Sequence, residues 1–151
     1  MSTPPPDDWP IPEEIRKWIG FKTTLGTEQV EAGTIRKFAD AYMDSNPLWY
    51  DEDYAKETPY GGVVAPPSFL HCLQTVGYPR KDLLKIPIPW ENHASLNGGN
   101  EFTLYEPMRP GDSITGEAEV VEIFGRLSKQ MGTLMFTVVE MTYTNQNGDL
   151  V

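Results

Sequence analysis

The sequence has few of the residues that support disulfide, metal or nucleic-acid chemistry. Of its 151 residues one is cysteine and two are histidine, which excludes an intrachain disulfide and a cysteine-based zinc site. Lysine and arginine together number 12 against 22 acidic residues, a formal charge of −10. Nucleic acids and anionic membrane surfaces bind clustered cations, so neither is an expected partner. No apolar run is long enough for a membrane span and no basic leader is present, so we expect a cytoplasmic protein without a bound metal.

With 39% hydrophobic residues the chain can still bury a core, and its prolines indicate where that core begins. Prolines concentrate in the first twelve residues and exclude regular structure there. We therefore expect residues 1–14 to form a flexible arm and residues 15–151 to form one domain. The hairpin signal Asn147-Gly148 lies three residues before Val151, so we expect a longer natural chain or a short last strand.

The order of periodic segments predicts an α+β domain, with helices first and strands after them. Apolar residues at helical spacing predict helices over 34–43 and 68–76, the second more buried than the first. Alternating patterns predict strands over 94–105, 112–124 and 134–144, and a short strand and turn over 21–30. In 134–144 both faces are apolar, which favours burial on both sides. Helices that precede antiparallel strands favour a helix packed on a sheet.

Two segments contain candidate functional residues with competing interpretations. Asp44, Asn46 and Pro47 follow the first helix and are ordinary helix-ending residues. The glycine-rich segment 61–65 could be only a turn before a buried helix. Its backbone N–H groups could also polarise a carbonyl oxygen at the helix entry, and the two interpretations are compatible.

Four segments, 38–55, 62–70, 106–112 and 141–149, resemble in their order the MaoC-like (R)-specific enoyl-CoA hydratases, and above all their N-terminal dehydratase-type domain. The resemblance implies a single hot-dog fold, in which a curved antiparallel sheet wraps a central helix. It also implies a second hot-dog subunit or domain as partner and a coenzyme A thioester as substrate, with no cofactor. Its implied substrate-binding residues are Asn46, Trp49, Gly62, Val63, Val64 and Ala65.

The chain departs from this family at one catalytic position. Asp44 stands where the family has its catalytic aspartate, but Trp49 stands where the family has a histidine. Hydration of an enoyl thioester needs a general base and a general acid, and an indole N–H can only donate. Asp44 is therefore expected to be vestigial or auxiliary. Neither His71 nor His93 is expected to replace the missing histidine.

Three functions remain open on this basis. The first is an incomplete subunit of a heteromeric enoyl-CoA hydratase that shapes the pocket for a bulky acyl group, such as a steroid side chain, while a sister subunit supplies the Asp/His pair. The second is a self-sufficient hydratase that uses Asp44. The third is a non-enzymatic module that binds acyl thioesters. The first is the preferred hypothesis, and it rests on family analogy.

Overall fold

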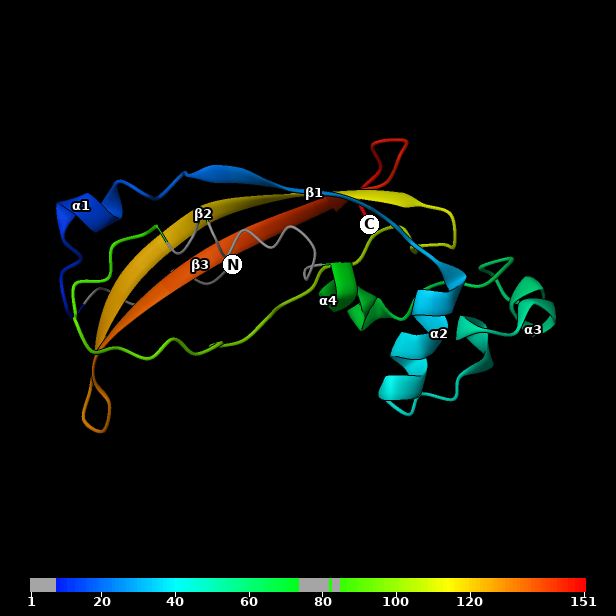
Figure 1. Cartoon of the computed structure of the whole chain (residues 1–151), viewed down its shortest axis with the longest axis horizontal. Coiled ribbons are helices and arrows are strands. Elements are labelled where there is room, and N and C mark those ends of the chain that lie inside the picture. Colours follow the sequence, from blue (N-terminus) through cyan, green and yellow to red (C-terminus); the bar gives the residue numbers. More distant parts are fainter. Residues whose placement is uncertain (1–7, 74–81, 83–84) are drawn as a thin grey trace. The chain divides into compact units, whose positions relative to one another are not determined.

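The computed structural model describes residues 8–73, 82 and 85–151, and helices precede the two long strands in it (Figure 1). Within these residues no helix is long and apolar enough to cross a membrane. The elements are α1 (Glu13–Arg16), β1 (Lys22–Gln29), α2 (Ala32–Ala41), the 3-10 turn η1 (Pro47–Trp49), α3 (Glu52–Lys56), the 3-10 turn η2 (Pro67–Phe69), α4 (Leu70–Leu73), β2 (Ser113–Ser128) and β3 (Gly132–Thr144).

The three strands form one sheet in the order β1-β2-β3 (Figure 1). Val120 N donates to Phe21 O over 2.9 Å at the start of β1, and Val30 N donates to Asp112 O over 2.8 Å just beyond its end. Because the pairing runs backward along the second strand, β1 and β2 are antiparallel. A short hairpin joins β2 to β3. The predicted α+β class is therefore confirmed.

Most predicted elements are present with shifted ends. The helix expected over 34–43 is α2, and the strands expected over 21–30, 112–124 and 134–144 are β1, β2 and β3. The helix expected over 68–76 begins as the 3-10 turn η2 and continues as α4 to Leu73. Its last predicted residues, 74–76, lie outside the described residues.

The strand predicted over 94–105 is wrong. These residues form no strand, and Phe102 and Leu104 are 40% and 47% exposed. Asn97-Gly98-Gly99-Asn100 interrupts the alternation, and Gly99 adopts a φ of 151° that suits glycine. At the end of the segment, Tyr105 N donates to Val151 O over 3.1 Å. The hairpin signal at Asn147-Gly148 returns the chain to a single antiparallel bridge between Thr144 and Leu150.

The structure divides into two compact units, and the long strands contribute to both. The first unit contains the described residues within 1–24, 79–97 and 118–141. Its apolar core holds Ile11, Ile15, Ile86, Val120 and Ile123. Ile11 is 5% exposed, and the ring of Trp9 lies 5.1 Å from that of Trp90. The boundary expected at residue 14 stays a prediction.

The second unit contains the described residues within 25–78, 98–117 and 142–151 and carries the predicted site. Its core joins α2 to the turn η2, because the ring of Phe38 meets that of Phe69 edge-on at 5.6 Å. Ile35 on the same helix is fully buried, and Phe69 is 1% exposed. These contacts fix the helix whose C-terminus leads into Asp44.

Burial on both faces of β3, expected from its apolar pattern, is also wrong. Met135 and Val139 pack against the core of the first unit. Phe136 and Val138 alternate with them and are 36% and 40% exposed. Nothing among the described residues covers this second face of the strand.

Candidate functional site

The backbone of Asp44 is positioned by the end of α2. Met43 N donates to Asp40 O over 3.0 Å, and Asp44 N donates to Ala39 O over 2.9 Å. These two bonds form a Schellman motif, in which the residue after the C-cap adopts a left-handed conformation. That residue is usually glycine, but here it is Met43, with a φ of 57°. A strained residue therefore directly precedes the predicted catalytic position.

Both carboxylate oxygens of Asp44 accept hydrogen bonds from its own loop. Oδ2 accepts the indole N–H of Trp49 over 2.9 Å, and Oδ1 accepts the backbone N–H of Asn46 over 3.1 Å. Trp49 is 9% exposed, whereas Asp44 lies at the surface. The tryptophan therefore occupies the predicted histidine position and also holds the aspartate. Sequence reasoning identified both residues but not the bond between them.

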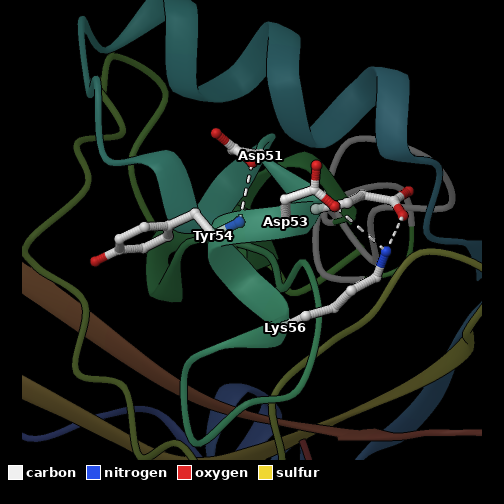
Figure 2. A network of polar contacts seen from close by, with 5 residues as sticks. Asp51, Asp53, Tyr54 and Lys56 are labelled. Carbon is white, nitrogen blue, oxygen red and sulfur yellow. Dashed lines mark hydrogen bonds and ion pairs between the residues drawn. The ribbon is translucent and has the colours of Figure 1, made fainter.

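Asn46 and Asp51 shape the rest of this loop as caps. Asn46 Oδ1 accepts Leu48 N over 3.1 Å and so begins η1, where Pro47 occupies the first turn. Asp51 Oδ1 accepts Tyr54 N over 3.0 Å and begins α3 (Figure 2). In the same view Lys56 extends toward Asp53, at 3.8 Å, one of its two acidic neighbours on the helix. The amide oxygen of Asn46 is therefore already occupied as the cap of η1.

Only some backbone N–H groups of the glycine-rich segment, residues 61–65, are free of partners within the described part of the fold. Ala65 N donates to Met108 O over 2.8 Å, and Gly61 N donates to Thr58 O over 3.0 Å, so neither N–H group is available to a ligand. The assignment of Ala65 as a donor to substrate is therefore corrected. The N–H groups of Gly62, Val63 and Val64 have no acceptor among the residues that the structure describes. Gly62 and Val63 are half-buried, while Val64 is buried.

Arg109 is a candidate that sequence reasoning missed. A Cβ atom on Gly62 would lie 3.9 Å from Arg109 Nη1, so the guanidinium lies beside the glycine-rich segment. Arg109 N donates to Asp112 Oδ2 over 2.6 Å, which holds its turn. The guanidinium itself is half-buried and has no carboxylate partner among the described residues. In the sequence, the feature that could have indicated Arg109 as a candidate was a single arginine within a turn motif of a strongly acidic chain.

The histidines occupy places that do not rebuild the missing pair. His71 is half-buried on α4, and its ring meets Phe102 edge-on at 5.1 Å. His93 is exposed and contacts Trp90 O through Nδ1 at 3.1 Å. The described residues show no hydrogen bond from either histidine to Asp44.

Electrostatics beside α4 also oppose nucleophilic chemistry. Burial raises the pKa of the Cys72 thiol, and the nearby carboxylate of Glu28 raises it further. Burial also raises the pKa of Glu28. A thiol with a raised pKa stays protonated at neutral pH, and the thiolate is the reactive form. The Cys72 thiol is therefore not an activated nucleophile.

This arrangement has groups that can bind a thioester carbonyl or an anion. Of the general base and general acid that hydration needs, it has one carboxylate, Asp44. Three backbone donors and a guanidinium lie in and beside one segment, as polarisation of a thioester carbonyl or binding of an anion would require. Asp44 could accept a proton, but its loop already donates to both of its oxygens and supplies no second acid–base group. Among the residues that the structure describes, Asp44 forms no hydrogen bond with the glycine-rich segment.

Comparison with known proteins identifies this chain as a hot-dog dehydratase domain. The MaoC-like dehydratase from Rhodospirillum rubrum matches 88% of this chain and 85% of its own, with a TM-score of 0.64 and 25% identity. The truncated HadBC (3R-hydroxyacyl-ACP dehydratase) complex from Mycobacterium tuberculosis matches 89% and 90%, with a TM-score of 0.68 and 20% identity. The predicted hot-dog fold is therefore confirmed.

The family follows from the sequence match. Residues 17–151 match the model of the FAS1-like dehydratase domain region, and the chain belongs to this family. A UPF0336 protein of Thermobifida fusca is 32% identical over 100 residues, 66% of this chain and 65% of its own. A probable enoyl-CoA hydratase alpha subunit of Thermomonospora curvata is 24% identical over 153 aligned positions, 92% of this chain.

Some relatives are much longer than this chain. The chain spans 48% of the Thermomonospora curvata subunit. It spans 38% of the 3-oxo-4,17-pregnadiene-20-carboxyl-CoA hydratase alpha subunit of Mycobacterium tuberculosis, with 25% identity over 119 residues. Each of these two comparisons therefore concerns only a part of the relative.

Proposed function

We propose that this chain is the non-catalytic hot-dog subunit of a heteromeric enoyl-CoA hydratase. In this assignment it binds and shapes the pocket for the acyl thioester, while a sister hot-dog subunit supplies the Asp/His pair. The observation that carries the proposal is the hydrogen bond of 2.9 Å from Trp49 Nε1 to Asp44 Oδ2. It places a group that can only donate where this chemistry needs a proton acceptor or relay.

Relatives in two-subunit systems support the division of labour. Two of them are named as alpha subunits of hydratases, and the HadBC structure is a complex. The substrate of one alpha subunit is a steroid-derived carboxyl-CoA. We therefore include a bulky acyl group, such as a steroid side chain, in the proposal. A pocket widened on the side that lacks catalytic groups would accept such an acyl chain without disturbing the reacting centre.

The proposed contacts of the thioester use the donors that the fold leaves open. Gly62, Val63 and Val64 supply backbone N–H groups, and Arg109 supplies a positive charge beside them. Asn46 and Trp49 maintain the loop, and Asp44 is a hydrogen-bond acceptor within it. No step of proton transfer is assigned to this chain.

Turnover of the assembled complex tests the proposal. The chain is co-purified with a candidate sister encoded in the neighbouring reading frame, and hydration of enoyl-CoA is followed. Asp44→Ala in this chain should leave kcat within a few-fold, whereas the same change in the sister's aspartate should lower it by about 10²–10⁴-fold. Asp53→Ala is the matched control, because it removes a fully exposed carboxylate whose contact is an ion pair with Lys56 at 3.8 Å.

Other outcomes select the other functions. If Asp44→Ala abolishes turnover while the complex stays folded and binds substrate, this subunit is catalytic and the proposal fails. If the chain alone hydrates enoyl-CoA at full rate, it is a self-sufficient hydratase. If it binds acyl-CoA but no sister restores turnover, it is a binding module.

A further inference from the structure

The outer face of the β2–β3 hairpin carries an exposed apolar patch that the proposed function does not use. On the inner face Val120 and Ile123 are buried, and Met135 and Val139 pack against the same core. On β3, Phe136 and Val138 face away from that core and are 36% and 40% exposed. On β2, Val121 is 38% exposed but is not counted in the patch. We call the set Glu122, Phe124, Arg126, Leu134, Phe136 and Val138 the outer patch.

The centre of the outer patch is already ordered. The rings of Phe124 and Phe136 stack across the two strands, with centroids 4.9 Å apart and planes 12° apart. The guanidinium carbon of Arg126 lies 4.7 Å from the centroid of Phe124, and Arg126 Nη1 donates to Gly125 O over 2.7 Å. Aromatic and arginine side chains are enriched in protein interfaces. Side chains that are held in place before binding lose little entropy on association.

The charges of the patch are arranged symmetrically about its aromatic centre. On β2, Glu122 precedes Phe124 by two residues and Arg126 follows it by two. Since strands rise about 3.3 Å per residue, each charge lies about 7 Å along the strand from Phe124. On β3, Leu134 and Val138 flank Phe136 at the same spacing. The patch is therefore negative at one end, positive at the other and apolar between them.

Such a pattern is complementary to its own copy. A twofold axis that lies between two facing sheets, perpendicular to their strands, reverses the strand direction and sets β2 over β2 and β3 over β3. With the axis at Phe124 and Phe136, Arg126 of each copy faces Glu122 of the other. Leu134 of each copy then faces Val138 of the other. A contact of this kind uses the same patch on both subunits, as twofold dimers require.

We infer that the outer patch binds a second copy of this chain by packing sheet against sheet. The occupant is argued from the charge pattern, because Glu122 and Arg126 lie at equal spacing on either side of Phe124 and therefore complement the same patch on a second copy. The aromatic pairs fill the centre of the interface, and two Arg126–Glu122 pairs set the antiparallel register. This contact is independent of the sister subunit in the proposed function, so either can fail without the other.

Sedimentation of the purified full chain over a range of concentrations tests the inference. The wild type should associate with increasing concentration through one twofold step. Phe136→Lys should weaken this step by about tenfold or more, because it places a charge at the centre of the interface. Leu96→Lys is the matched control, since Leu96 is 75% exposed, belongs to the same unit and lies outside the patch. It should leave association unchanged.

Charge reversal tests the register itself. Arg126→Glu should oppose Glu122 in the facing copy, and Glu122→Arg should oppose Arg126, so each change alone should prevent association. The double variant should associate again. A wild type that stays unassociated at all concentrations overturns the inference. So does association that survives Phe136→Lys, or a double variant that behaves like the single ones.

Discussion

Trp49 donates its indole N–H to Oδ2 of Asp44 over 2.9 Å, across five residues of sequence. The hydrogen bond joins a buried ring to a surface carboxylate and closes the loop between α2 and α3. In the proposed function these two residues stand at the positions of the family's acid–base pair, and the indole N–H of Trp49 can donate a proton but cannot accept one.

Replacing Trp49 separates this hydrogen bond from the packing of the ring. Trp49→Phe keeps most of the buried surface but loses the bond, so we expect a loss of about 1 kcal/mol in the free energy of unfolding. Trp49→Ala also creates a cavity, and we expect a loss of about 3–5 kcal/mol. Urea unfolding of both variants measures the difference. A Trp49→Phe variant as stable as the wild type would show that the indole N–H contributes nothing, and equal losses in the two variants would show that the packing of the ring contributes nothing.

Restoring the histidine should not restore catalysis. Trp49→His returns a proton acceptor to the position but removes the donor that holds Asp44 Oδ2. Acid–base groups act only when water and carbonyl are aligned with them to within about an ångström. We therefore expect the purified variant to hydrate enoyl-CoA far more slowly than the complete pair in the assembled enzyme. A variant that equals the assembled enzyme contradicts our assignment.

Sequence patterns predicted the elements whose residues contact one another locally. The stripe of Ile35, Phe38 and Ala39 is buried in α2 as its spacing requires. The strand prediction for residues 94–105 failed because an alternating pattern forms a strand only where a neighbouring strand accepts its hydrogen bonds. The prediction that both faces of β3 are buried failed for a related reason. An apolar pattern does not show which surface, if any, covers a strand face.

The candidate site shows the same limit. The motif around Asp44 predicted a site there, and the donor-only indole of Trp49 predicted an incomplete acid–base pair; both stay predictions. Hydrogen bonds from Ala65 to Met108, and the approach of Arg109 to Gly62, join segments more than forty residues apart. No local pattern encodes such contacts. They became visible only in the folded chain.

Glycine at position 43 should stabilise the protein. Met43 has a φ of 57°, a conformation that costs an L-residue with a side chain about 1–2 kcal/mol. Its side chain is 90% exposed, so Met43→Gly loses little packing. After the entropy cost of glycine in the unfolded chain, we expect a gain of about 0.5–1 kcal/mol. Met43→Ala keeps the strain, so thermal unfolding should show no comparable gain for it.

Acid should remove the contribution of Asp82 to stability. Hydrogen bonds from Lys85 and Thr23 lower the pKa of this carboxyl below its ordinary value of 3.8, and the charge of Lys85 adds to the effect. A folded pKa below the unfolded one stabilises the protein above the unfolded pKa, and this stability is lost as pH falls through the folded pKa. Asp82→Asn should therefore be less stable than the wild type at pH 7.

The difference between Asp82→Asn and the wild type should shrink as the pH falls below about 4. Urea unfolding at several pH values follows it. Lys85→Met is the companion variant, because it removes the largest cause of the shift while leaving Thr23 in place. If the stability difference is independent of pH, the ion pair at 2.6 Å does not persist in solution.

An alanine at Gly125 should displace the N-terminal segment from the first unit. A Cβ atom there would overlap Trp9 O and lie 2.7 Å from Trp9 Cε3, too close for the backbone to stay in place. The segment around Ile11 would have to shift, with partial loss of its burial. We expect a loss of about 1–3 kcal/mol in the free energy of unfolding.

Two comparisons isolate this contact as the cause. Gly33→Ala places the same methyl group in α2, where nothing lies within 4 Å, and should stabilise the chain by about 0.5–1 kcal/mol because alanine favours helix. In a chain that begins at residue 12 Trp9 is absent, so Gly125→Ala should then cost almost nothing. If the full loss persists in the shortened chain, strand geometry at Gly125, rather than the approach of Trp9, determines the requirement for glycine.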